Sequence, residues 1–180
     1  MTDLRVPTNW CVITGGPSSG KTTTVNILRA RGYNTTIEHA RHYLDTQRQQ
    51  GHTVEEVRAN QIAFQLGVLK MQIEQEAELN PNELVFLDRA IPDALAYYRF
   101  LHMKPDNMLL DALKRVSYRM VFLLDPLPLV HDYARTEDSS AQMKLHELLN
   151  DVYRSFGFPV VRVAVADADA RVDMILRSVS

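Results

Sequence analysis

The residues with the clearest chemical meaning lie near the N-terminus, where GGPSSGKT occupies positions 15–22. This stretch matches the pattern G-x-x-x-x-G-K-[ST], in which small residues let consecutive backbone amides turn toward the phosphates of a nucleotide. An apolar stretch precedes the motif and a helical pattern begins at its lysine, which is the context that a phosphate-binding loop requires. We therefore predict a nucleotide-binding loop formed by Gly15, Gly16, Ser18, Ser19, Gly20, Lys21, Thr22 and Thr23.

Three side chains of this loop have distinct expected roles. The Lys21 ammonium would contact the β- and γ-phosphates, and the Thr22 hydroxyl would complete the coordination of Mg²⁺. Thr23 would contact the α-phosphate. Pro17 has no amide hydrogen to donate and must therefore sit at the outer bend of the loop. An Asn/Thr-Lys-x-Asp motif for reading guanine is absent from the sequence, so we expect the ligand to be ATP with Mg²⁺.

Carboxylates follow three of the apolar stretches that we expect to be strands. They are Glu38, Asp88 and Asp125. Ligands of open α/β sheets bind beyond the carboxyl ends of the strands, so each carboxylate is a candidate site residue. VFLDR and VFLLD place Asp88 and Asp125 in equivalent positions, and the pattern alone does not separate them. Because Pro126 follows Asp125, that position is more typical of a turn, and we leave it out of the predicted site.

These residues must be positioned by alternating strands and helices. Short apolar or β-branched runs predict five strands, at 10–14, 33–37, 83–87, 118–124 and 158–165. Helical patterns cover 21–31 and 39–50, begin again at Pro92 and Pro105, and mark a terminal helix around 172–179. A long helix should run from Thr53, capped with Glu56, to Asn80, and another from a Ser139–Gln142 cap to Phe156. Buried strands separated by helices predict a parallel sheet covered on both faces.

One glycine has no evident role in this arrangement. Gly67 lies inside the predicted long helix, where glycine costs about 1 kcal/mol relative to alanine. We therefore expect either a close contact with another helix or a kink at this position.

Composition limits the class of protein. The chain has 180 residues, 46% of them apolar, and its 20 basic and 22 acidic residues give a net charge of −2. This composition excludes a disordered or collagenous chain, and it gives no support to nucleic-acid binding through a broad basic face. The single Cys11 favours a reducing compartment, and no run approaches 18 apolar residues. We expect one domain over residues 1–180, no membrane segment and a cytoplasmic location.

Taken together, the motifs carry a family resemblance. VITGGPSSGKTT, IEHAR, FLDRAIPDALAYYRF, ARTED, KLHELL and RVDMIL resemble successive segments of a small bacterial AAA-domain family of P-loop ATPases. That family is related to the ribosylnicotinamide kinase part of a bifunctional NAD-synthesis protein and, more distantly, to nucleoside and nucleotide kinases. The resemblance implies the P-loop NTPase fold, a three-layer α/β sandwich with a five-stranded parallel sheet of order 2-3-1-4-5. In that order, the strand carrying Asp88 lies beside the strand that leads into the loop.

The resemblance also implies roles for individual residues. Asp88 would hold Mg²⁺ through water, and Arg89 would contact the acceptor or the transferring phosphoryl group. Glu38 would accept the proton of the acceptor hydroxyl, although Asp88 would be the base if the acceptor lies toward the third strand. The segment 126–138 matches an arginine-bearing lid, with Arg135 as the mobile arginine.

The acceptor would lie near two further groups of residues. Arg41 is one helical turn after Glu38 and either pairs with it or meets an acceptor phosphate. Tyr97, Tyr98 and Arg99 follow Asp88 and Arg89 on the next helix, where an aromatic ring could stack on an acceptor ring; core packing is the alternative.

We thus predict an enzyme, a small-molecule kinase that transfers the γ-phosphoryl group of Mg-ATP to a hydroxyl or phosphate of a metabolite. The alternative is a nucleotide-binding switch that hydrolyses ATP or GTP and acts on a protein partner. The sequence does not identify the acceptor, and it leaves open whether the protein is a monomer or a homodimer.

Overall fold

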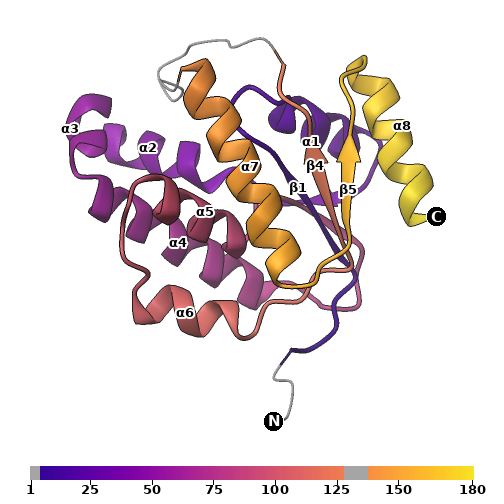
Figure 1. Cartoon of the computed structure of the whole chain (residues 1–180), viewed down its shortest axis with the longest axis horizontal. Coiled ribbons are helices and arrows are strands. Elements are labelled where there is room, and N and C mark those ends of the chain that lie inside the picture. Colours follow the sequence, from indigo (N-terminus) through magenta and orange to yellow (C-terminus); the bar gives the residue numbers. More distant parts are fainter. Residues whose placement is uncertain (1–4, 128–137) are drawn as a thin grey trace.

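A computed structural model describes residues 5–127 and 138–180 (Figure 1). Its sheet has five strands in the order β2-β3-β1-β4-β5, and every neighbouring pair is parallel. This confirms the predicted fold class and strand order. The strands are β1 (Trp10–Thr14), β2 (Asn34–Thr35), β3 (Val85–Asp88), β4 (Met120–Leu124) and β5 (Val160–Val163). The second strand is much shorter than the predicted 33–37.

Eight helices connect and cover these strands in the described part of the chain. They are α1 (Lys21–Ala30), α2 (His39–Gln49), α3 (Val54–Ala59), α4 (Gln61–Glu78), α5 (Ile91–Phe100), α6 (Asn107–Leu113), α7 (Ser139–Ser155) and α8 (Ala168–Val179). None of the helices within 5–127 and 138–180 is long and apolar enough to cross a membrane.

Three helix boundaries differ from the predictions. Helix α6 begins at Asn107 rather than at Pro105, because the Asp106 carboxylate accepts from Leu109 N at 2.9 Å and caps it. The long helix is interrupted at Asn60, which has non-helical backbone angles (φ −98°, ψ 74°) and whose side chain accepts the amide hydrogen of Ala63, so it caps α4. The predicted capping box of Thr53 and Glu56 is present, but it begins only the short α3. The cap of α7 is Asp138 rather than Ser139, because the Asp138 carboxylate accepts from Ala141 N at 2.8 Å.

The core lies on both faces of the sheet. Along β1, Trp10 and Val12 join a cluster with side chains of α5 and α7, whereas Cys11 and Ile13 join a cluster with side chains of α1 and α8. Alternate strand residues point to opposite faces, so a fully buried strand needs apolar residues at every position. A smaller cluster of Leu44, Phe64 and Val68 joins α2 to α4 at one side of the sheet.

Gly67 on α4 packs against the ring of Tyr43 from α2. A Cβ atom added to Gly67 would lie 2.2 Å from Tyr43 Cε2, far inside van der Waals contact. The Tyr43 ring is also in edge-to-face contact with Phe64, with centroids 5.6 Å apart, which limits where it can move. The predicted close helix contact is therefore confirmed.

We expect Gly67→Ala to destabilise the protein despite the better helix propensity of alanine. Alanine regains about 1 kcal/mol of propensity, whereas overpacking against the ring costs about 1–3 kcal/mol. Chemical denaturation should therefore show a net loss. In a Tyr43→Leu background the same substitution should become neutral or stabilising. A gain in stability in the unmodified background would contradict this account.

Candidate active site

The phosphate loop leaves the end of β1 and enters α1, as predicted. Gly20 is the cap residue of α1 and adopts a left-handed conformation (φ 84°) that glycine adopts without strain. Gly16 is required for another reason: a Cβ atom there would lie 2.7 Å from the carbonyl oxygen of Gln142 on α7. Helix α7 therefore packs directly against the loop.

Lys21 turns its ammonium back into the loop. Its Nζ donates to Gly15 O at 2.9 Å, Gly16 O at 2.8 Å and Ser19 Oγ at 3.2 Å, and the side chain is buried. Burial, together with the neighbouring Arg89 guanidinium, lowers the pKa of Lys21. Because the Gly15 carbonyl points toward Lys21, the Gly16 N–H on the same peptide plane points the opposite way. The amides that can face an anion on the Lys21 side thus come from later residues of the loop.

Asp88 ends β3 directly beside the start of the loop, because it pairs in register with Ile13 of β1. Its amide donates to Thr36 Oγ1 at 2.9 Å, and its side chain is buried. Within the described residues, its Oδ1 atom is buried and has no hydrogen-bond partner. Burial, and then the charge of Glu38, raise the pKa of the Asp88 carboxyl group.

The orphaned Asp88 oxygen fits the predicted magnesium site. A buried acceptor of this kind suits a water molecule of a hydrated cation, and Mg²⁺ usually keeps several waters. Residues 5–127 and 138–180 contain no group of three or more His, Cys, Asp or Glu side chains arranged to hold a metal. Phosphate oxygens, water and the Thr22 hydroxyl would therefore have to supply the other ligands.

Glu38 links the loop to Arg89 and Arg41. One carboxylate oxygen pairs with Arg89 Nη2 at 3.3 Å, and the other accepts from Thr22 Oγ1 at 3.4 Å and lies 3.7 Å from Arg41 Nε. Arg89 also donates to the Tyr97 hydroxyl at 2.8 Å and adopts a left-handed backbone conformation (φ 66°). Such conformations are strained for residues other than glycine and cluster at functional sites.

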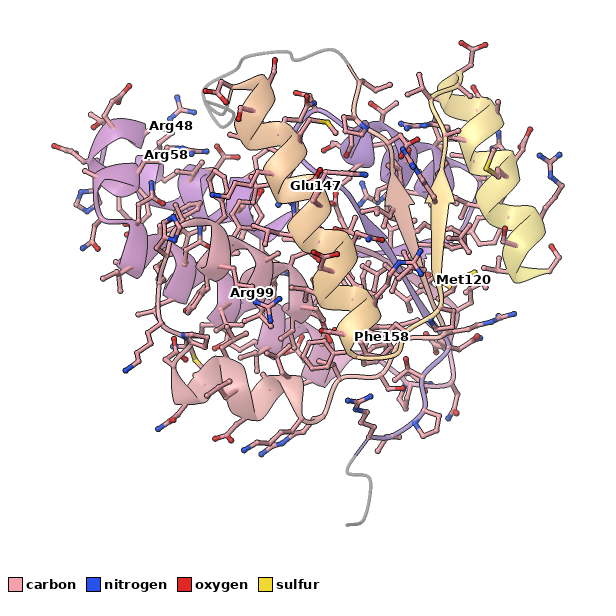
Figure 2. The ribbon with its side chains drawn as sticks, in the orientation of Figure 1. Arg48, Arg58, Arg99, Met120, Glu147 and Phe158 are labelled. Carbon is pink, nitrogen blue, oxygen red and sulfur yellow. The ribbon has the colours of Figure 1, made fainter. Side chains whose placement is uncertain are left out.

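A cavity of about 350 Å³ opens beside these groups. Pro17, Glu38 and Arg89 line the end next to the loop. The α2–α4 region supplies Leu44, Arg58, Phe64 and Val68, and α5 supplies Tyr97 and Phe100. Figure 2 shows Arg58 at the end of the molecule that also carries Arg48. Mixed apolar walls with a few polar groups are typical of small-molecule sites.

The structure separates the predicted acceptor residues. Arg41 and Tyr97 line the cavity, whereas Tyr98 and Arg99 do not. Tyr98 is buried in the core, and its hydroxyl donates to the Asp106 carboxylate at 2.9 Å. Arg99 lies exposed on α5 (Figure 2). Arg135 and most of the predicted lid lie outside the described residues.

Sequence reasoning missed the polar side chains that α4 contributes to the cavity. Gln65 and Gln72 are both buried, and the Gln72 Oε1 atom has no hydrogen-bond partner in the described part of the chain. The two glutamines lie seven residues apart on the same buried face of α4 as Phe64 and Val68. Two amide side chains within an otherwise apolar stripe of a helix were the feature of the sequence that could have indicated this polar part of the site.

Solved structures of kinases share this fold. Deoxyadenosine kinase from M. mycoides, with dCMP and a flexible dCDP bound as products, is 15% identical over 94% of this chain and 97% of its own, with a TM-score of 0.64. Thymidylate kinase from Ehrlichia chaffeensis is 12% identical over 95% and 98%, with a TM-score of 0.63.

NadR has been solved in complex with NR and in complex with NAD and AMP-PNP. These two structures are 16% and 19% identical to this chain over 93% of its length, with TM-scores of 0.65 and 0.63. The chain spans about half of NadR, since the match covers 48% of that protein. At such identities the likeness shows the fold.

No curated protein matches the chain by sequence. A family model described as an AAA domain matches residues 10–171, from the first residue of β1 to the first turn of α8. This protein therefore belongs to that AAA domain family.

Proposed function

We propose that this protein is a kinase that transfers the γ-phosphoryl group of ATP to a small-molecule acceptor. The observation that carries the proposal is the position of Glu38. Its carboxylate contacts Thr22 of the phosphate loop and Arg89 on one side, and it lines the 350 Å³ cavity on the other. A nucleotide on the loop and an acceptor in the cavity would meet at this residue.

The transfer then follows from the groups around Glu38. Lys21 would exchange its carbonyl partners in the loop for the β- and γ-phosphates. As the acceptor hydroxyl oxygen attacks, the new P–O bond forms, the bond between the γ-phosphorus and the β-phosphate oxygen breaks, and the proton passes to Glu38. Arg89 would bind the equatorial oxygens of the transferred group. Magnesium held by Thr22 and, through water, by Asp88 would offset the charge of the phosphates.

The choice of base is supported by exposure to the cavity. Glu38 lines it, whereas Asp88 is buried behind the loop and does not. A general base must reach the proton that it removes, so we assign this role to Glu38 and the magnesium role to Asp88.

We further propose an acceptor with a planar ring that carries an N–H donor. Gln72 Oε1 needs such a donor, because leaving a buried carbonyl unpaired costs about 1–3 kcal/mol. Phe64 and Tyr97 provide aromatic surfaces in the same cavity. The M. mycoides enzyme is a deoxyadenosine kinase and one NadR structure contains NR, which supports a nucleoside-like acceptor.

A transfer screen tests the proposed activity. Mg-ATP would be incubated with nucleosides, nucleoside monophosphates, cofactor precursors and sugars, and the products identified by mass. We expect a phosphorylated nucleoside-like product with the unmodified protein and none with Lys21→Ala, with circular dichroism confirming that the variant is folded. Full activity of Lys21→Ala would refute the site, and hydrolysis without any phosphorylated acceptor would favour the nucleotide switch.

Substitution of the two carboxylates, Glu38 and Asp88, should impair activity in different ways. Glu38→Gln removes the proton acceptor, so kcat should fall by a factor of about 10²–10⁴ while the Mg²⁺ requirement stays the same. Asp88→Asn should instead raise the Mg²⁺ concentration that gives half-maximal rate. Steady-state kinetics over a Mg²⁺ series separates the two effects. An unchanged Mg²⁺ requirement in Asp88→Asn, with activity retained in Glu38→Gln, would make Asp88 the base.

Gln72→Leu should weaken acceptor binding selectively. Loss of the amide oxygen should raise the KM of the acceptor by about tenfold, which corresponds to about 1.4 kcal/mol, and leave the KM of ATP unchanged. Gln75→Leu is the matched control, because Gln75 lies on the same helix outside the cavity and its amide oxygen pairs with His39. Equal effects of the two variants on acceptor KM would contradict the assigned contact.

A further inference from the structure

Three successive carbonyls on the outer side of the phosphate loop are each held by a donor from elsewhere in the chain. Pro17 O accepts from Gln142 Nε2 at 2.7 Å, Ser18 O from the Leu127 amide at 3.0 Å and Ser19 O from Arg171 Nη1 at 2.6 Å. The donors come from α7, the segment after β4 and α8.

These contacts fix the orientation of three peptide planes. In a trans peptide the carbonyl of one residue and the N–H of the next point in opposite directions, and the described chain has no cis peptide bonds. Holding the carbonyls of residues 17, 18 and 19 outward therefore turns the amides of Ser18, Ser19 and Gly20 to the opposite side. Outward carbonyls thus set the direction of three consecutive donors.

The donor side chains are themselves rigidly placed. Gln142 is buried, and its Nε2 also donates to Leu127 O at 3.0 Å, so it contacts the same residue whose amide holds Ser18 O. Arg171 is 2% exposed and also donates to Asp125 O at 2.8 Å and Ala164 O at 3.0 Å. One guanidinium thus joins the loop to the ends of two strands.

Arg171 also brings charge to this position. Its hydrogen-bond acceptors among the described residues are main-chain carbonyls, while the Asp125 carboxylate pairs with Arg162 at 2.6 Å. A Cβ atom added to Gly20 would lie 3.1 Å from Arg171 Nη1, so the guanidinium lies against the backbone of the loop. A buried cation that is only weakly compensated attracts an anion on the other side of that backbone.

We propose that Gln142 and Arg171 are positioning residues of the phosphate site. They turn the amides of Ser18 and Gly20 toward the nucleotide phosphates, and Arg171 adds positive charge behind the loop. This inference rests on the nucleotide site of the proposed function, but it does not require that any acceptor be phosphorylated.

The experiment measures Mg-ATP binding by calorimetry without acceptor for Arg171→Met, Arg171→Lys and Gln142→Met. We expect Kd to rise tenfold or more in Arg171→Met, with partial rescue in Arg171→Lys. In Gln142→Met it should rise about three- to tenfold, as for the loss of one hydrogen bond to the loop. In amide NMR spectra, the shift of Gly20 on adding magnesium pyrophosphate should shrink in both Arg171 variants.

Arg31→Met is the matched control. Arg31 joins α1 to α8 through Asp169 and Asp173 at 2.7 and 2.6 Å, so its loss loosens the same helix without freeing a loop carbonyl. Its Kd should stay within twofold of the unmodified protein. An equal loss in Arg31→Met would overturn the proposal in favour of general docking of α8.

The remaining outcomes separate this inference from the proposed function. Unchanged Kd values in folded Arg171→Lys and Gln142→Met overturn the inference, even if Arg171→Met does not fold. If the protein binds ATP but phosphorylates no acceptor, the proposed kinase activity is refuted. The Kd values of the variants then still test the positioning role of Gln142 and Arg171. Failure of the unmodified protein to bind Mg-ATP overturns both.

Discussion

Ile13 of β1 pairs with Asp88 of β3, and this parallel register determines where the charged groups of the site stand. The chain leaves β1 as the phosphate loop and leaves β3 as Asp88-Arg89, so a buried lysine, a buried carboxylate and a partly buried arginine meet at one edge of the sheet. Burying isolated charges is costly, and here the opposite charges of Glu38, Asp88, Lys21 and Arg89 compensate one another. Shifting β1 or β3 by one residue would move its charged residues away from those of the other strand, and the charges would no longer compensate one another.

The short β2 has a related consequence. Because β2 ends at Thr35, the chain reaches Glu38 and α2 directly at the sheet edge, and Glu38 points back to Thr22 and Arg89. Helices α2 and α4 then pack on each other through Leu44, Phe64 and Val68. The cavity lies between this helix pair and α5, so the same packing that stabilises the helices shapes the wall opposite Glu38.

The features that could be predicted from the sequence are mostly those that leave a local pattern in it. The loop motif, the five apolar strands and the capping box of Thr53 are local signals, and the family resemblance supplied the strand order. The break at Asn60 was missed because an asparagine in a helical pattern is unremarkable until its side chain caps the next helix. Tyr98 could not be separated from Tyr97, since neighbouring helical residues point about 100° apart and only the packed structure shows which one faces the cavity. Gln142 was interpreted as a capping residue, whereas its amide reaches a loop 125 residues away in sequence.

Pro17 marks the point where the loop reverses its polarity. The carbonyls of Gly15 and Gly16 point inward to the Lys21 ammonium, whereas those of Pro17, Ser18 and Ser19 are held outward by α7, Leu127 and α8. The peptide between residues 16 and 17 is the last of the inward set, and its N–H would point away from the phosphates. Proline has no N–H at this plane, so it removes a donor that could not face an anion, and it fixes φ where the chain must turn. The Lys21 ammonium thus occupies the inward side of the loop, while the outward carbonyls are held by other elements. Phosphate binding would therefore require movement of the Lys21 side chain rather than of the backbone.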